Sequence, residues 1–564
     1  MSAKRGASGP ATLLLLLALS PAAFAQDRPS ENDMFGGPPA APAAPPATKP
    51  EVKPEAKPEA KPQAPPDDGK APAETVTIEA APPTPAPGVP PAAAAATGAI
   101  DRDQTLLGDP NAGPQLSSEA APENPLTIGG QLYLRAQSVI QEHTYPDHWT
   151  LTSPSLLDAY FDARPNDRVR AFIRARVSYD PTAAPSGAAP SGSGQGMTGS
   201  GGALTGSSVT GFTTFNASRG PNTVLDQMWM AFDIERTVFV TAGKQHVKWG
   251  TGRFWTPTDF LHPVKRNPLD VFDARPGTSM LKLHFPWEAR AWNFYAFGVF
   301  EDPNTTSNNL GQVAGAARAE LVYGPAELGL DVLLKRGQKP RAGADLSVGV
   351  GDFDLYTDVG LRAGSEIGIV HAVDPAMVPV MCSSDLSQKY RVDPASGIKP
   401  QIVGGVTWAR KYNDNDVLTI GGEYFYNSIG YSDPSIYPGL LFNDQHTPML
   451  NFFYTGRHYA ALFASLPAPY SWNYTTFTLS TIGNLSDMSF VTRFDYSVTL
   501  LTHLTFEAFV AGHYGHLGGE FRLGFQIDPQ VLCDANGVPT GAVLAFPPVN
   551  APIVDMGVAL RLKI

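Results

Sequence analysis

The chain has little cysteine and no excess of positive charge. Its only cysteines, Cys382 and Cys533, are too few for a disulfide framework or a thiolate metal site. They leave two alternatives, one bridge between two loops or two free thiols. Lys and Arg number 41 against 53 Asp and Glu, a formal net charge of −12, which excludes a chain-wide basic surface for nucleic acid.

Long apolar runs and helical periodicity are also missing. Beyond the first few dozen residues no stretch of about 18 consecutive apolar residues occurs, so an α-helical membrane protein is not expected. The chain is instead rich in Phe (29), Tyr (19) and Gly (54), a composition that suits strands and turns.

Motifs of catalysis and metal binding are lacking as well. There is no Gly-x-Ser-x-Gly elbow and no His-Glu-x-x-His pair. Residues 194–199 match a dinucleotide fingerprint, but they lie in a Ser/Gly-rich stretch with neither a strand before nor a helix after them. We therefore predict no enzyme activity, no cofactor and no metal.

The N-terminal part predicts export followed by a spacer. Residues 1–25 combine Lys4 and Arg5, a short apolar core and a small-x-small cleavage site ending at Ala25, the pattern of a signal peptide. Residues 26–124 are rich in Pro, Ala and Lys and contain a near-repeat of Lys-Pro-Glu-Ala. Such a composition cannot build a core and favours a disordered, extended segment. We interpret it as a periplasmic spacer, either a plain linker or a segment that binds peptidoglycan or periplasmic proteins.

From Pro125 onward, apolar and polar residues alternate with a period of two. Leu132 and Leu134 share one face of the first segment, while Gln131, Tyr133 and Arg135 share the other. Segments of about ten residues with this alternation are typical of tilted membrane-spanning strands. Residues 125–564 are therefore predicted to form an all-β fold, an antiparallel transmembrane β-barrel of about 18 strands, with 16 as the alternative.

The connections and the C-terminus support a barrel. Short turns, such as those at Glu235-Arg236 and Gly351-Asp352, alternate with long loops, such as 181–221 and 428–457, as in outer-membrane barrels. The final alternating strand resembles the C-terminal assembly signal of such barrels, although it ends in Ile564 where an aromatic residue is usual. An even strand number places both barrel ends on the periplasmic side, and residues 520–528 are assigned to the last long loop.

The polar faces of the first strands supply the candidate pore lining. A column of arginines on one strand would attract anions, unless it is neutralised by cross-strand carboxylates. Both interpretations remain open from the sequence. The pore-lining candidates are Arg135, Asp158, Asp162, Arg168, Arg170, Arg174 and Arg176.

The most distinctive stretch runs from Gly243 to Phe260. Its Gly243-x-Gln245, Trp249-Gly250 and Phe254 to Asp259 elements resemble a pattern of porin-like outer-membrane families of unassigned substrate. We expect this segment to fold into the lumen as a constriction loop, with cationic and aromatic side chains facing solute; a cap on the rim is the alternative. The constriction candidates are Lys244, His246, Lys248, Trp249, Arg253 and Trp255.

These features predict a porin-like channel in the outer membrane of a Gram-negative cell. We expect passive or weakly selective diffusion of small solutes, with anions favoured if the arginine column is not neutralised. The alternative is an export or envelope-assembly barrel whose spacer recruits periplasmic partners. The expected partners are outer-membrane lipid, the barrel-assembly machinery and small solutes, with no nucleic acid.

Overall fold

A computed structural model gives the three-dimensional arrangement of most of the chain after residue 124. The predicted signal peptide and spacer, residues 1–124, lie outside the described residues. The structure describes residues 125–183, 220–262, 264–270, 273, 275–300, 313–374, 386–413, 416–445, 449–526, 530–533, 539–544 and 548–564.

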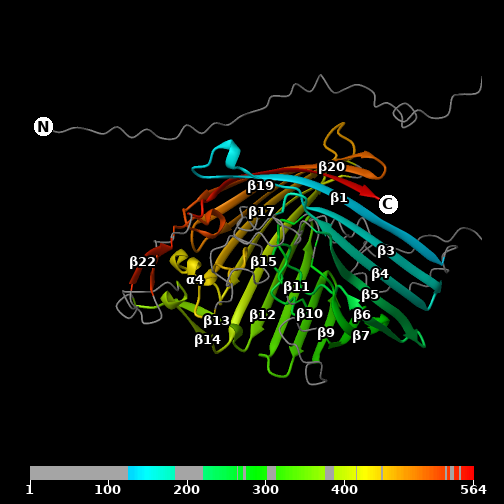
Figure 1. Ribbon diagram of the computed structural model, residues 1–564. Helices are drawn as coiled ribbons and strands as arrows, with labels where there is room; N and C mark the ends of the chain where they lie inside the picture. Colours follow the sequence, from blue (N-terminus) through cyan, green and yellow to red (C-terminus); the bar gives the residue numbers. More distant parts are fainter. Residues whose placement is uncertain are drawn as a thin grey trace, which may run out of the picture. The chain divides into compact units, whose positions relative to one another are not determined.

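Within these residues, eighteen long strands form one antiparallel sheet that closes on itself (Figure 1). Each strand pairs with the next along the chain, and the last pairs with the first in a register that includes Leu134 opposite Leu560. Closure leaves no strand edge unpaired, as a sheet within lipid requires. The predicted barrel is confirmed, with the larger of the two strand counts. The strands are β1 (Leu126–Gln141), β3 (Ser155–Asn166), β4 (Val169–Tyr179), β5 (Asn222–Ile234), β6 (Val238–Gln245), β7 (Thr278–Trp287), β8 (Trp292–Val299), β9 (Ala314–Tyr323), β10 (Ala326–Leu334), β11 (Arg341–Val350), β12 (Phe353–Arg362), β15 (Lys399–Lys411), β16 (Val417–Asn427), β17 (His458–Pro467), β18 (Thr475–Asn484), β19 (Ser489–Leu501), β20 (Leu504–Gly515) and β23 (Pro552–Lys563).

Smaller elements lie in the connections between these strands. Of these elements, only β2 joins the barrel sheet, by pairing with the loop-rim end of β1. The hairpins β13–β14 and β21–β22 form two separate sheets. Among the described residues, no helix is long and apolar enough to cross a membrane. These elements are η2 (Pro146–His148), β2 (Thr150–Thr152), η3 (Glu288–Arg290), β13 (Ser365–Ala372), η6 (Leu386–Lys389), β14 (Tyr390–Ala395), η7 (Pro434–Ile436), α4 (Tyr437–Leu441), η8 (Glu520–Arg522), β21 (Gln530–Cys533) and β22 (Pro539–Leu544).

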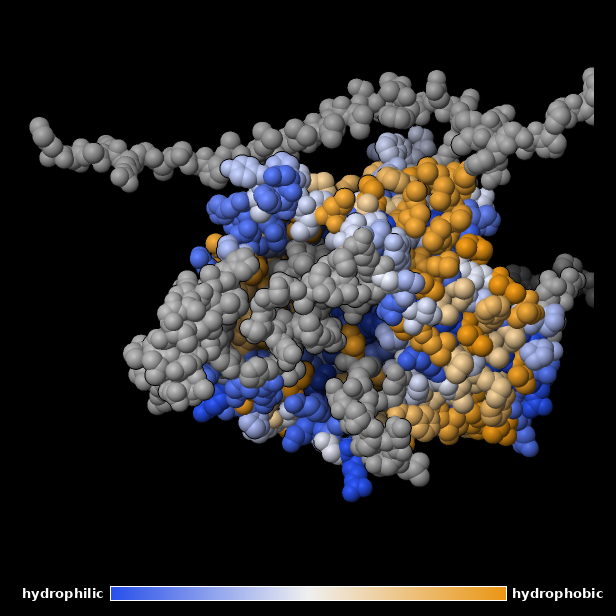
Figure 2. All heavy atoms as spheres, in the orientation of Figure 1, coloured by the Kyte–Doolittle hydropathy of each residue, from blue (hydrophilic) through white to orange (hydrophobic). Residues whose placement is uncertain are grey.

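The sheet is apolar outside and polar inside. Ile128 and Leu462 on the outer face are 64% and 66% exposed, whereas Asp158, Arg174 and Arg493 on the inner face are buried. Figure 2 shows apolar residues gathered over the outer surface at β1, β3 and β4. This arrangement inverts that of a soluble protein and matches a barrel whose outer face contacts lipid.

Exposed aromatic side chains form two girdles on the outer face. Aromatic rings with a polar atom favour the boundary between hydrocarbon and water, so two girdles mark the two membrane interfaces. The girdle at the rim of short turns contains Trp287, Tyr323, Phe353 and Trp472, and the girdle at the opposite rim contains Trp149, Tyr179, Tyr424 and Tyr514.

The two rims differ in the length of their connections. The first strand begins and the chain ends at the turn rim, where the Gly130 and Ile564 backbones exchange hydrogen bonds. The stretch 520–526 lies in the connection between β20 and β23 at the loop rim, as predicted. The loop rim also has connections that the sequence pattern did not separate: residues 335–340 and 485–488 are short, and β13 and β14 form a hairpin inside one long loop.

Candidate lumen and inward-folded loop

The arginine column on β4 points into the barrel, and each of its arginines pairs with a carboxylate. Arg176 Nε donates to Asp158 Oδ1 at 2.8 Å, and Arg170 donates to both Asp162 oxygens at 2.9 and 3.0 Å. Matched pairs of this kind cancel most of the positive field of the column. Of the two interpretations that the sequence leaves open, the side chains therefore follow the second, in which cross-strand carboxylates neutralise the arginines.

The other two arginines of the column pair with carboxylates on β5. Arg168 binds Asp233 through Nε and Nη2, the latter at 2.8 Å, and Arg174 binds Asp226 within a pair that is almost wholly buried. The His246 ring nitrogen Nε2 lies 3.0 Å from the second Asp226 oxygen. Asp226 thus joins β4, β5 and the segment that follows β6.

A β-bulge brings Asp226 into the lumen. The register between β4 and β5 shifts at Arg174, so that two consecutive residues, Asp226 and Gln227, are both buried on the inner face. A bulge can redirect a side chain in this way. Sequence reasoning missed Asp226, although the adjacent polar pair inside an alternating strand was the signal for it.

Arg135 on β1 also faces inward, and its guanidinium lies beside an aromatic ring. Its guanidinium lies 4.8 Å from the centroid of Phe509 on β20, and Arg493 on β19 lies 4.2 Å from the same ring. Two guanidiniums over one ring hold positive charge close to the inner wall, because the ring face attracts cations. The predicted inward direction of Arg135 agrees with this arrangement.

The loop between β6 and β7, residues 246–277, folds across the lumen. The Glu423 carboxylate on β16 accepts the backbone N–H groups of Arg253 at 2.7 Å, Phe254 at 3.1 Å and Trp255 at 2.9 Å. The Tyr356 hydroxyl donates to the same carboxylate at 2.9 Å. Because β16 lies far around the barrel from β6, these bonds carry the loop to the opposite wall.

Two glycines allow this close approach. Gly250 has a φ of +92°, and a Cβ there would collide with the Asp358 carboxylate and with Thr258. A Cβ at Gly252 would overlap the backbone carbonyl of Trp255. The Trp-Gly-Thr-Gly stretch is therefore required by the path of the loop against the wall.

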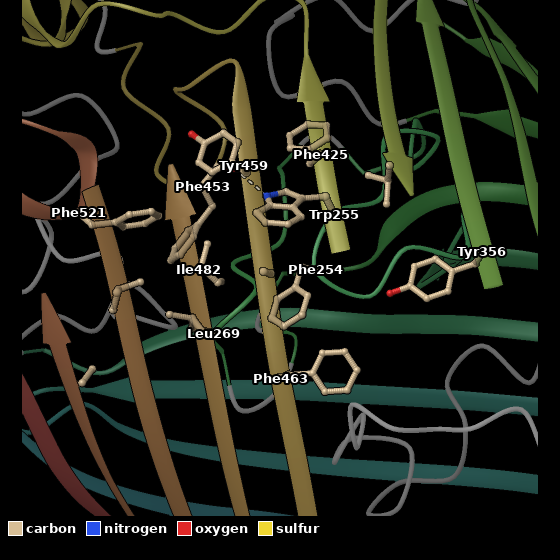
Figure 3. Packing of buried hydrophobic residues seen from close by; sticks show 14 residues of the cluster. Phe254, Trp255, Leu269, Tyr356, Phe425, Phe453, Tyr459, Phe463, Ile482 and Phe521 are labelled. Carbon is tan, nitrogen blue, oxygen red and sulfur yellow. Dashed lines mark hydrogen bonds between the residues drawn. The ribbon is translucent and has the colours of Figure 1, made fainter. Parts of the chain in front are cut away.

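Aromatic side chains anchor the loop at both ends of its crossing. Trp255 is fully buried, stacks on Phe425 with centroids 5.4 Å apart, and donates its indole N–H to the Phe453 carbonyl at 2.8 Å (Figure 3). Trp249 is 1% exposed and meets Phe297 of β8 edge-on. The expectation that these two indoles face solute is wrong, because both are buried in packing contacts.

The basic constriction candidates divide among three environments. Lys244 pairs in register with the outward Met228, so its side chain starts on the lipid face, contrary to expectation. Lys248 is exposed. Arg253 lies 3.4 Å from the Phe463 centroid, and burial lowers its pKa to about 9. The loop enters the lumen as expected, yet it holds few of the predicted side chains toward open solvent.

A buried ion cluster holds the second half of the loop. Arg275 donates to Asp259 at 3.0 Å and to Asp273 at 2.6 Å, and His262 Nδ1 lies 2.8 Å from Asp259. Burial raises the pKa of Asp259, but His262 and Arg275 outweigh burial and hold that pKa below its ordinary value. The cluster therefore favours ionised carboxylates inside the lumen.

Cations outnumber anions near Lys265 of the same loop. Burial and the guanidinium of Arg362 lower the pKa of Lys265 to about 7. Arg362 lies 5.9 Å from the Phe260 ring centroid, and Arg341 on the adjacent strand pairs with Glu366 at 3.2 Å. The side chains of Cys382 and Cys533, which the sequence leaves either bridged or free, lie outside the described ones.

Comparison with known proteins yields similarities to solved structures only. No family model matches the chain, and no curated protein matches it. The chain is similar to OccK2 (OpdF) of Pseudomonas aeruginosa, with 10% identity and a TM-score of 0.40 over 78% of this chain and 98% of that one. It is similar to OpdK of the same species, crystallised with vanillate, with 10% identity, a TM-score of 0.40 and the same coverage. It is also similar to OccAB3 of Acinetobacter baumannii, with 10% identity and a TM-score of 0.39 over 78% of this chain and 99% of that one. The strand pairings of this chain establish its barrel without these proteins.

Proposed function

We propose that this chain is an outer-membrane channel for passive or weakly selective diffusion of small solutes, with its N-terminal segment in the periplasm. The observation that carries the proposal is the polar interior of a closed barrel of eighteen strands within the described residues. Barrels of this size enclose an aqueous channel. The loop 246–277 narrows that channel, because its backbone is bonded to β16 on the far wall.

Conductance in planar bilayers tests the channel. We expect the purified full chain to insert and give discrete, ohmic current steps. Protein that is folded by heat-modifiable electrophoretic mobility and yet gives no conductance would refute the proposal. The same experiment addresses the export alternative, since a chain lacking residues 30–120 should conduct like the full chain if the barrel is a simple pore.

We further propose a weak preference for anions. The support comes from Lys265 in the loop and Arg362 on β12, whereas the β4 column is largely cancelled by its partners. Cation-rich lumen walls raise the local concentration of anions. The preference should be modest, because carboxylates such as Asp259 and Asp273 lie in the same loop.

Reversal potentials in a KCl gradient measure this preference. We expect the wild-type channel to favour chloride slightly. Arg170→Ala combined with Arg174→Ala leaves Asp162 and Asp226 without their main partners, so selectivity should shift toward potassium. A wild-type cation preference that these substitutions leave unaltered would rule out the anion proposal.

A further inference from the structure

Six consecutive strands each place an aromatic ring on the inner wall. Their registers show this directly: Phe172 lies opposite Asp162 and Trp229, and Phe239 lies opposite Asp233 and His284. Asp233 is buried inside the barrel, so the rings beside it also face inward. The six rings, called here the ring band, are Tyr160 (β3), Phe172 (β4), Trp229 (β5), Phe239 (β6), His284 (β7) and Tyr295 (β8).

Neighbouring rings of the band adjoin one another in two groups, and three of their contacts are nearly parallel. Tyr160 and Phe172 have centroids 5.7 Å apart and Phe172 and Trp229 5.5 Å apart, both with interplanar angles of 23°. His284 and Tyr295 are 4.6 Å apart at 14°. His284 also lies 5.7 Å from Phe239 at an interplanar angle of 35°, so the band consists of two groups of adjoining rings, Tyr160–Phe172–Trp229 and Phe239–His284–Tyr295.

The ring band is open toward the lumen. Phe172 is buried by its neighbours, whereas Tyr160, Trp229 and Tyr295 are only half-buried. Tyr160 lies across Gly129 of β1, occupying the space that a Cβ there would need. One side of that ring is thus fixed on the sheet, and its other side faces the interior. Within the described residues, Tyr295 packs against the cluster that contains Trp249 of loop 246–277, whereas Tyr160 and Trp229 belong to none of the hydrophobic clusters that include loop residues.

Charged groups frame the ring band: three arginines pair with carboxylates, and one lysine, Lys282 of β7, is buried beside His284. Arg170 binds Asp162 through two N–H groups and lies 5.3 Å from the Trp229 centroid. Arg168 binds Asp233 in the same two-bonded manner. At the other end of the band, the Tyr295 hydroxyl donates to Glu320 at 3.0 Å and Arg318 donates to the same carboxylate at 2.9 Å.

We propose that the ring band is a binding track for neutral saccharides that pass through the channel. The C–H faces of a pyranose ring stack on aromatic rings, while its hydroxyls both donate and accept hydrogen bonds, which paired guanidinium and carboxylate groups can supply together. An anionic aromatic solute would instead need an accessible, uncommitted cation beside the rings, but Arg168 and Arg170 are held by carboxylates and Lys282 is only 7% exposed. This inference rests on the proposed channel function and names its solute class.

Sugar-dependent block of single-channel current tests the track. Maltotriose added to the wild-type channel should reduce the open current saturably at millimolar concentration. Tyr160→Ala combined with Trp229→Ala should raise the half-blocking concentration about tenfold, the loss expected for two ring contacts. Tyr323→Ala combined with Trp292→Ala is the matched control, because these residues of the same types lie on the outer face near the turn rim, and it should block like wild type.

Three further arms make the outcome decisive. Tyr160→Phe combined with Trp229→Phe keeps rings in place and should retain block within a few fold, which separates ring contact from misfolding. Polyethylene glycol of matched size should not block saturably; equal block by the polymer would show size exclusion alone and overturn the track. Benzoate that blocks more strongly than maltotriose would also overturn it. A channel that conducts but ignores maltotriose rejects only this inference, whereas absence of conductance rejects the channel itself.

Discussion

The lumen wall has two regions built from the same residue types and used in different ways. On β12, β16 and β17, the rings of Tyr356, Phe425 and Phe463 are buried under loop 246–277. On β3, β5 and β8, Tyr160, Trp229 and Tyr295 remain half-buried. The alternation of apolar and polar residues along the strands produces both walls. The course of loop 246–277 decides which wall becomes a packing surface and which remains available to solute.

The largest expected effect comes from releasing the loop from the packed wall. Glu423→Ala removes the acceptor of three buried backbone N–H groups, which costs about 3 kcal/mol or more of loop attachment. Loop 246–277 should detach from β12, β16 and β17. The single-channel conductance should then rise severalfold, because this wall becomes as uncovered as the wall of β3, β5 and β8.

The control for this change is Glu507→Ala. Glu507 is an inward carboxylate on β20 that pairs with Arg561 of β23 at 2.9 Å. Its loss should leave the size of the conductance unchanged. If Glu423→Ala also leaves conductance unchanged, the loop does not limit the current and the packed wall is not a constriction.

The next effect concerns the loop-rim end of the packed wall. Burial and the neighbouring Asp487 raise the pKa of Glu520 to about 8, and Glu520 accepts the Phe453 backbone N–H and, at 2.5 Å, the Tyr459 hydroxyl. A raised carboxyl pKa favours the protonated form in the folded state. The protonated acid therefore contributes its full stabilisation below about pH 4.5, and this stabilisation is lost as pH rises through about 8, roughly 3 kcal/mol between about pH 6 and pH 9.

Hydrogen exchange averaged over the amides of residues 449–456 measures this loss of stability, because the Phe453 amide by itself binds the ionised carboxylate more strongly. Protection should fall as pH rises through about 8, beyond the intrinsic increase of exchange with pH. Glu520→Gln mimics the protonated acid and should flatten the dependence. Equal corrected protection at about pH 6 and pH 9 in the wild type would show that Glu520 does not titrate in this range.

Much of this architecture follows from the sequence because a strand has a period of two. Once Leu132 and Leu134 face lipid, Tyr133 and Arg135 must face inward, and the structure agrees. The strand number and the common rim of the two barrel ends follow in the same way. Short turns at the loop rim, such as 485–488, carry no signal that separates them from turns at the other rim.

The site was less accessible to sequence reasoning because it depends on distant contacts. The bulge that turns Asp226 inward depends on the register with β4, and the outward direction of Lys244 follows from its pairing with Met228. The burial of Trp255 depends on Glu423 and Phe453, almost 200 positions along the chain. The motif around Trp249 predicts an inward loop, but it does not specify which of its side chains the wall will cover.

A smaller effect is expected from the charge that the loop contributes. The Lys265 pKa of about 7 means that its ammonium is mostly charged below this pH and mostly neutral above it. Anion preference should therefore increase as pH falls from about 8 to about 6. Lys265→Arg remains charged throughout and should show a flatter dependence in reversal-potential measurements. A wild-type dependence as flat as that of Lys265→Arg would remove Lys265 from the selectivity of the channel.

The smallest effect is expected for an ion pair at the turn rim. Its N–O distance is similar to that of an ion pair in the lumen, but its side chains are exposed. Arg236 and Asp167 are 3.1 Å apart with side chains 73% and 42% exposed, whereas Arg176 and Asp158 are 2.8 Å apart and almost fully buried. Water and salt screen the exposed pair, so Arg236→Ala should change the free energy of unfolding by less than about 0.5 kcal/mol, as measured by urea unfolding in lipid vesicles. A loss well above 1 kcal/mol would mean that similar distances confer similar strength at both sites, and that burial in the lumen wall is not what distinguishes its ion pairs.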